Sequence, residues 1–150
     1  MNVPFLELKP TYLELKDELD QAYQRVMDGG WYVMGSELDK FEEEFAGYCE
    51  TKYCVGVANG MDALQLALLA WDIGPGDEVI VPGMTFIATW LAVSQTGATP
   101  VPVDVCADTV NIDASLIEQS ITPNTKAIIP VHLYGQPADM DPILSIADKH

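Results

Sequence analysis

The chain has 150 residues, a net charge of −16 and 49% hydrophobic residues, enough apolar material for one domain with its own core. None of its seven lysines and arginines lies between Tyr53 and Thr125. Nucleic acid and anionic membrane surfaces are bound by clustered basic side chains, so both are poor partners for this chain. The sequence has neither a signal-peptide pattern at its start nor an apolar run of the ~20 residues that span a bilayer. We therefore expect a soluble, cytoplasmic protein.

The three cysteines, Cys49, Cys54 and Cys106, are odd in number and have no CxxC spacing. They therefore predict neither a disulfide framework nor a zinc site, and we expect no bound metal. Cysteines in such a pattern usually act as small apolar side chains in a reducing compartment.

The first fifty residues have a helical pattern. Apolar residues recur at three- and four-residue steps over 12–26 and predict a helix that Gly29 and Gly30 end. Residues 31–35 are predicted to be a short extended link, after which Ser36 caps a second helix. We expect residues 1–50 to form an N-terminal helical segment.

Strands and helices alternate from Tyr53 onward. The predicted strands are near-continuous apolar runs, as expected where helices cover both faces of a parallel sheet. They are Cys54–Ala58, Glu78–Pro82, Thr99–Asp104 and Ala127–His132. The predicted helices are Met61–Trp71, Phe86–Thr96, Ala114–Ile121 and one that starts near Met140. The pattern predicts an α/β fold with a mostly parallel sheet, whose ligands would gather at the carboxyl ends of the strands.

The turn after the first predicted strand is a candidate phosphate site. A strand that turns through Asn59 into a helix leaves the backbone N–H groups of Gly60, Met61 and Asp62 unpaired at the helix N-terminus. Such a terminus carries partial positive charge and binds phosphate readily. The alternative is an ordinary turn in which Asp62 complements the helix dipole. The chain has no GxGxxG or Walker sequence, so neither a dinucleotide fold nor a P-loop is supported.

Two aromatic side chains follow other predicted strands. Phe86 opens the helix after the second strand, where it could stack on a flat heterocycle or pack in the core. His132 ends the fourth strand and could contact substrate or cofactor. A hydrogen-bonded histidine that fixes the end of the strand is an equally good interpretation.

These segments occur together in an order that resembles the DegT/DnrJ/StrS family of sugar-nucleotide aminotransferases, which depend on pyridoxal phosphate. The matching segments cover nearly the whole chain: GWYVMG at 30–35, FEEEFA at 41–46, ANGMDAL at 58–64, GPGDEVIVP at 74–82, TFIAT at 85–89, TPNTKAI at 122–128 and PVHLYGQPADM at 130–140. The resemblance implies the fold of the aspartate aminotransferase type (fold type I). Residues 51–150 would then be the N-terminal half of the pyridoxal-phosphate-binding large domain, truncated, with its remainder and a small C-terminal domain absent.

The resemblance also implies roles for individual residues. The implied cofactor contacts are Gly60, Met61 and Asp62 at the phosphate and Phe86 against the pyridine ring. The residues implied to lie near the substrate or active site are Trp31, Tyr32, Met34 and His132. In this family the site is built at a homodimer interface. The lysine that forms a Schiff base with the cofactor and the aspartate at the pyridine nitrogen are expected beyond His150, so no catalytic residue is assigned and residues 1–150 alone are expected to be inactive.

The reaction implied for the intact protein is transfer of an amino group, from L-glutamate, to a keto-sugar linked to dTDP, UDP or GDP in amino-sugar biosynthesis. Met61 and Asp62, in place of the Thr-Ala of some 4-keto-sugar members, favour a 3-keto sugar. Two alternatives remain open. One is a sugar dehydratase of the same family, in which histidine replaces the lysine, and the other is a non-catalytic binding or regulatory domain.

Overall fold

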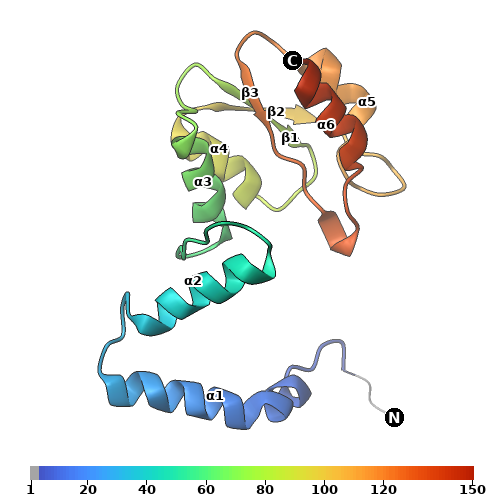
Figure 1. Ribbon diagram of the computed structural model, residues 1–150. Helices are drawn as coiled ribbons and strands as arrows, with labels where there is room; N and C mark the ends of the chain where they lie inside the picture. The colour runs from blue at the N-terminus through green and yellow to red at the C-terminus, as the bar shows by residue number, and fades with distance from the viewer. Residues whose placement is uncertain (1–3) are drawn as a thin grey trace. The chain divides into compact units, whose positions relative to one another are not determined.

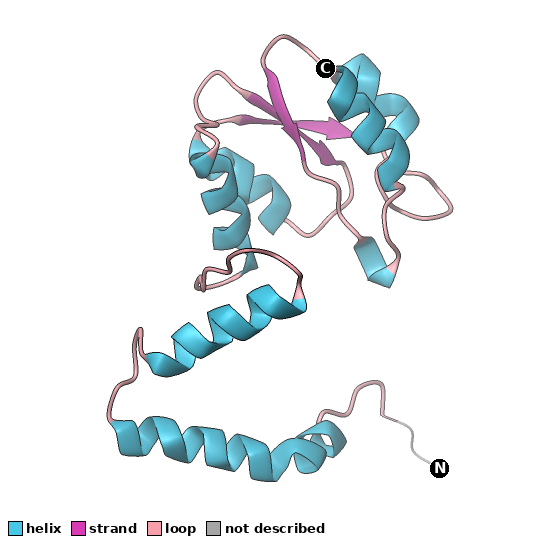
Figure 2. Ribbon diagram, in the orientation of Figure 1, coloured by secondary structure: helices cyan, strands magenta, loops and turns pink. Residues whose placement is uncertain are grey.

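The computed structural model describes residues 4–150 of the chain. It consists of two units, Met1–Gly56 and Val57–His150, each of which is considered by itself (Figure 1). The first unit contains two helices, whereas the second contains a sheet with helices (Figure 2). Within residues 4–150, no helix combines the length and the apolar character that crossing a membrane requires.

The first unit begins with the helix that the sequence predicts. Helix α1 (Lys9–Gly29) has Pro10 in its first turn, where the missing N–H of proline is no loss. Its C-cap is Gly30, which has a left-handed backbone (φ 62°) and donates its N–H to the Met27 carbonyl. The predicted glycine stop is therefore confirmed.

Helix α2 (Ser36–Tyr48) follows, but two predictions about its start are wrong. Its N-cap is Gly35, and Ser36 is the first helical residue and makes no side-chain cap. Residues 31–35 are not extended, because Met34 has a φ of 50° and the Trp31 indole N–H donates to the Met34 carbonyl at 3.0 Å. The indole ring leaves no space at Gly35, where a Cβ would lie 2.6 Å from the ring.

The second unit contains a parallel three-stranded sheet in the order β2-β1-β3, which confirms the predicted parallel α/β pattern. The strands are β1 (Glu78–Pro82), β2 (Thr99–Val103) and β3 (Thr125–Ile128). Strand β2 pairs with β1 alone and carries Pro100 and Pro102, which an edge position tolerates because proline has no N–H to donate.

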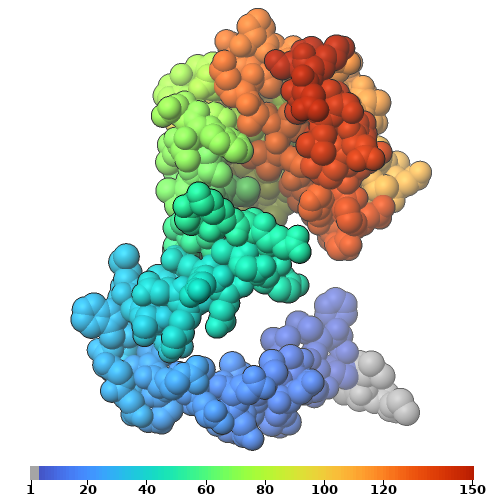
Figure 3. Space-filling view, in the orientation of Figure 1, coloured from blue at the N-terminus to red at the C-terminus, as the bar shows by residue number. Residues whose placement is uncertain are grey.

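Helices cover both faces of this sheet. Helices α3 (Gly60–Ala70) and α4 (Ala88–Thr96) lie on one face, and α5 (Ala114–Ile117), the short 3-10 helix η1 (Glu118–Ser120) and α6 (Met140–Lys149) lie on the other (Figure 1). The side chains of strand β1, which is buried from Val79 to Pro82, alternate between two hydrophobic clusters. Val79 and Val81 join the cluster of α3 and α4, whereas Ile80 joins that of α5 and α6. The space-filling view shows the second unit as one continuous body (Figure 3).

Two predicted strands differ from the structure. Residues 54–58 form no strand, and Val55 is 75% exposed, because β-branched residues favour a strand only where a neighbouring strand completes the hydrogen bonds. The Gly56 N–H instead donates to the Glu42 carboxylate at 2.7 Å. Strand β3 ends at Ile128 rather than at His132, and Pro130, which has no N–H, follows two residues later.

Candidate functional site

The N-terminus of α3 is capped by Asn59, whose backbone is extended (φ −163°). The Asn59 Oδ1 accepts a hydrogen bond from the Asp62 N–H at 2.9 Å, and the Asn59 Nδ2 donates to the Asp62 carboxylate at 3.0 Å. The Asp62 N–H group is therefore not unpaired, contrary to the prediction, because an asparagine at the N-cap takes up an amide of the first turn.

The two preceding amides of this turn remain free. Within residues 4–150, the N–H groups of Gly60 and Met61 have no hydrogen-bond acceptor, as expected for the first residues of a helix. A Cβ on Gly60 would meet no atom within 4 Å, so the space beside this turn is open. Free amides and the positive end of the helix dipole suit an anion such as phosphate. Since no lysine or arginine lies between Tyr53 and Thr125, the partial positive charge at the N-terminus of α3 is the main attraction for an anion in this stretch.

Phe86 lies in the loop between β1 and α4. Helix α4 begins at Ala88, so Phe86 precedes the helix rather than opening it as predicted. The Phe86 side chain is 75% exposed in this chain, which contradicts a core position. The loop itself is held at both ends: Thr85 and Thr89 share a hydrogen bond of 3.0 Å, and the Trp90 indole donates to the Pro82 carbonyl at 3.1 Å. An exposed ring on a fixed loop is available for stacking on a flat ligand.

His132 is exposed and lies four residues beyond the end of β3. Its Nδ1 accepts a hydrogen bond from the Ala138 N–H at 2.9 Å, which supports the interpretation that this histidine fixes a loop. Because Nδ1 is the acceptor, the neutral imidazole carries its proton on Nε2. Nε2 has no partner within the described residues and remains available to a ligand.

Three segments lie at the carboxyl edge of the sheet, where α/β domains bind their ligands. They are the N-terminus of α3, the loop from β1 to α4, and the short η2 segment (Leu133–Gly135) after β3. Figure 1 shows all three on the same side of the second unit. Helices α3 and α4 also pack against each other, which holds the first two segments together.

The remaining predicted site residues, Trp31, Tyr32 and Met34, belong to the first unit. They are exposed by 70%, 63% and 80% respectively. The hydrogen bond from the Trp31 indole to the Met34 carbonyl fixes this segment locally. The second unit thus carries Gly60, Met61, Asp62, Phe86 and His132 on three segments at one edge of its sheet, whereas the other three residues are described within the first unit.

Asn111 was not predicted from the sequence. It lies in the loop between β2 and α5, is 3% exposed, and makes hydrogen bonds with both ends of the turn that follows His132. The only signal in the sequence is its place between Val110 and Ile112, two apolar residues that hint at a buried loop.

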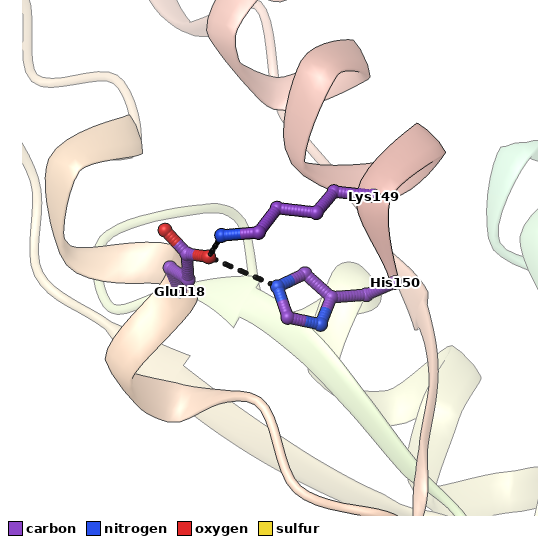
Figure 4. A network of polar contacts seen from close by, with 3 residues as sticks. All are labelled: Glu118, Lys149 and His150. Carbon is purple, nitrogen blue, oxygen red and sulfur yellow. Dashed lines mark hydrogen bonds and ion pairs between the residues drawn. The ribbon is translucent and has the colours of Figure 1, made fainter.

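The opposite, amino edge of the sheet holds an ion-pair cluster. Glu118 of η1 receives hydrogen bonds from Lys149 and His150 at the end of α6, the latter at 3.0 Å (Figure 4). The hydrogen bond from Lys149, followed by that from His150, lowers the pKa of the exposed Glu118 carboxyl. A groove between the 106–115 loop, η1 and α6 borders this cluster and contains none of the predicted site residues.

A parallel α/β domain with free helix amides and an exposed aromatic ring at its carboxyl edge belongs to the class of anion- and cofactor-binding domains. Comparison with known sequences identifies the protein family within this class. The chain belongs to the DegT/DnrJ/EryC1/StrS aminotransferase family, whose profile matches residues 13–150.

Individual relatives agree with this assignment. The chain is 61% identical over 148 residues to dTDP-3-amino-3,4,6-trideoxy-alpha-D-glucose transaminase from Streptomyces venezuelae, with 99% of this chain and 39% of the relative covered. The crystal structure of S. venezuelae DesV in complex with ketimine intermediate superposes with a TM-score of 0.94 at 61% identity, covering 99% of this chain and 40% of DesV.

A second solved structure is more distant in sequence. NtdA from Bacillus subtilis, with bound cofactor PMP, has a TM-score of 0.91 at 40% identity and covers 99% of this chain and 34% of its own. These superpositions, each over 99% of the chain, confirm the predicted fold class. The chain spans about 40% of the length of DesV and of the S. venezuelae transaminase.

Proposed function

We propose that the protein containing this chain is a pyridoxal-phosphate-dependent aminotransferase that transfers an amino group to a keto-sugar linked to a nucleoside diphosphate. The observation that carries the proposal is the 61% identity to a transaminase named for a 3-amino sugar attached to dTDP. The proposal concerns the whole enzyme, of which residues 1–150 would be the N-terminal part, since the chain spans about 40% of the length of these relatives.

The residues at the carboxyl edge fit the cofactor. The free N–H groups of Gly60 and Met61 would hold its phosphate, and the exposed ring of Phe86 would lie against its pyridine ring. Asp62 would act through the turn that it shapes with Asn59, because its own N–H is already bonded. When bound, pyridoxal phosphate supplies an electron sink for amino transfer.

The same proposal assigns the substrate side. Trp31, Tyr32, Met34 and His132 would lie near the keto-sugar nucleotide, to which His132 can offer its Nε2–H group. L-Glutamate is the proposed amino donor, and a 3-keto sugar is the proposed acceptor, supported by the name of the S. venezuelae relative. Amino-sugar biosynthesis is the proposed pathway class.

Further parts of the proposal concern the whole protein. Residues 1–50 would be an N-terminal helical segment, and residues 51–150 the first half of the cofactor-binding large domain. The family resemblance supports a homodimer and a cytoplasmic location. The exposed apolar side chains of α1 and α2, such as Leu19 and Phe45, support an assembly in which further protein covers these helices.

The test is a transamination assay on the full-length protein. Purified protein is loaded with pyridoxal phosphate and supplied with ¹⁵N-labelled L-glutamate and a 3-keto or a 4-keto dTDP-sugar. We expect 2-oxoglutarate and a ¹⁵N-containing sugar nucleotide, formed faster from the 3-keto substrate. Residues 1–150 expressed alone serve as the inactive control.

Other outcomes would point elsewhere. A sugar product that has lost oxygen without gaining ¹⁵N would indicate the dehydratase alternative. Failure of the protein to bind pyridoxal phosphate, seen as no visible absorbance after gel filtration, would contradict both enzymatic functions and favour a binding or regulatory domain.

A further inference from the structure

The segment Leu133–Gln136 has an unusual backbone for its sequence. Its two central residues, Tyr134 and Gly135, have φ values of 55° and 81°, and the Gln136 N–H donates to the Leu133 carbonyl at 3.1 Å. Positive φ at both central positions is the geometry of a type I′ turn rather than of a helix. A tyrosine in the left-handed region is strained, so the surrounding structure has to hold it there.

The side chain that holds this turn is Asn111. Its Oδ1 accepts a hydrogen bond from the Leu133 N–H at 3.0 Å, and its Nδ2 donates to the Gln136 carbonyl at 2.9 Å. One amide therefore pairs with both ends of the turn, as a neighbouring peptide group would. Asn111 is only 3% exposed, so water does not replace these bonds readily and their loss is costly.

Asn111 is itself fixed to the core. Its carbonyl accepts a hydrogen bond from the Cys106 N–H at 2.9 Å. The next residue, Ile112, is 3% exposed, pairs with Val105 and belongs to the cluster packed under α5 and α6. The amide thus connects the loop after β2, through its buried neighbour, to the loop after β3.

The turn carries two groups that a ligand could contact. His132 precedes it and has only Nε2 free, because the Ala138 N–H occupies Nδ1 at 2.9 Å. Tyr134 lies within it and is 80% exposed. We propose that Asn111 is a positioning residue that holds the Leu133–Gln136 turn and so presents the His132 imidazole and the Tyr134 phenol to the sugar nucleotide. The inference rests on the proposed function for its ligand, and on the hydrogen bonds above for its geometry.

The decisive variant in the full-length protein is Asn111→Asp. An ionised carboxylate accepts from the Leu133 N–H but cannot donate to the Gln136 carbonyl, whereas a protonated carboxyl group does both. Because position 111 is buried, loss of hydration should raise the pKa of the introduced carboxyl, so the defect should diminish as the pH falls. Asn124→Asp is the matched control, since it makes the same chemical change at an exposed position at the amino edge.

Two measurements are compared with wild type at each pH. In Asn111→Asp, we expect the amide exchange rate of the 130–139 segment and the KM for the keto-sugar nucleotide both to rise about tenfold over wild type at pH 8. Both should recover towards pH 6, and the KM for glutamate should stay unchanged. The titratable groups that share the groove with Asn111 are Cys106, Asp113, Glu118 and Asp139, and His132 adjoins the turn. These groups titrate in the wild-type protein as well, so the comparison of variant and wild type at the same pH removes their contribution.

A second variant separates the turn from the group that it presents. Tyr134→Asn relieves the left-handed strain, because asparagine tolerates positive φ, but removes the phenol. We expect unchanged exchange in the 130–139 segment and a raised KM for the sugar nucleotide alone. A KM equal to that of wild type would overturn the assignment of Tyr134.

The outcomes distinguish this inference from the proposed function. The positioning role would be overturned if the enzyme is active and Asn111→Asp changes neither the amide exchange rate nor KM. It would also be overturned if the variant changes each of them by the same factor at every pH. An inactive wild-type protein would overturn the proposed function and with it the sugar ligand. If, in addition, Asn111→Asp left the amide exchange rate of the 130–139 segment unchanged, the geometric part would be overturned as well.

Discussion

Asn59 and Asp62 exchange two hydrogen bonds across the first turn of α3, one at 2.9 Å from the Asp62 N–H and one at 3.0 Å to its carboxylate. This reciprocal cap leaves two amides of the turn, those of Gly60 and Met61, for an anion. The cap thus shapes the candidate phosphate site and stabilises the helix at once.

Replacement of Asn59 by alanine should lower the free energy of unfolding by about 1 kcal/mol, because the Asp62 N–H loses its acceptor. Urea denaturation of the full-length protein measures the change. Asn59→Ser is the control and should lie close to wild type, since serine also accepts a hydrogen bond at an N-cap. An equal loss in both variants would contradict the capping role.

Gly60→Pro should weaken the binding of pyridoxal phosphate about tenfold, because proline removes one of the two free N–H groups. The helix should tolerate it, since Gly60 is the first helical residue and Asn59 has the extended backbone that precedes proline. Gly60→Ala keeps the N–H and meets no atom within 4 Å, so its affinity should equal that of wild type. Absorbance titration with the cofactor measures both, and equal affinities would exclude this amide.

Phe86→Ala should leave stability within about 0.5 kcal/mol of wild type, because the side chain is 75% exposed. Its cofactor affinity should nevertheless fall several-fold as the stacked ring is lost. Ile87→Ala is the matched control, since its neighbouring side chain is 57% exposed and is assigned no ligand. Thermal melts with and without cofactor report both quantities, and an equal loss of affinity in the two variants would contradict stacking.

The ion-pair cluster at Glu118 predicts a pH dependence of stability. Lys149 and His150 lower the pKa of this carboxyl below its ordinary value of 4.5, so the stability that it contributes is present above that value and is lost as the pH falls through the lowered pKa. Glu118→Gln should therefore flatten the acid limb of the stability profile. High salt should shrink the difference, because the groups are exposed. Identical acid limbs in low salt would contradict the prediction.

Periodicity predicted the buried part of the fold well. Strand β1 and the start of α6 lie where the apolar pattern placed them, because side chains that face a core have to follow the geometry of their element. The strand predicted at 54–58 fails for the opposite reason. Its pattern is that of a strand, but strand formation depends on a neighbour that no local pattern encodes.

The candidate site was predicted unevenly. A short turn between apolar segments located Gly60 and Met61, and the end of the second predicted strand located Phe86, whose ring the resemblance then assigned to the pyridine. Neither could reveal that Asn59 takes up the Asp62 amide or that Asn111 reaches the turn after His132, 25 residues away from Gln136 in sequence. Side-chain pairings of this kind depend on loop geometry, for which the sequence has no repeating signal.

The alternation of side chains along β1 couples the two sides of the second unit. Val79 and Val81 supply one hydrophobic cluster and Ile80 the other, so neither cluster is complete without the same five-residue strand. Insertion or deletion of one residue in this strand would exchange the faces of all that follow. The helix layers on the two sides should therefore melt in a single cooperative transition, and a destabilising substitution on the side of α5 and α6 should also destabilise the candidate phosphate site at the N-terminus of α3.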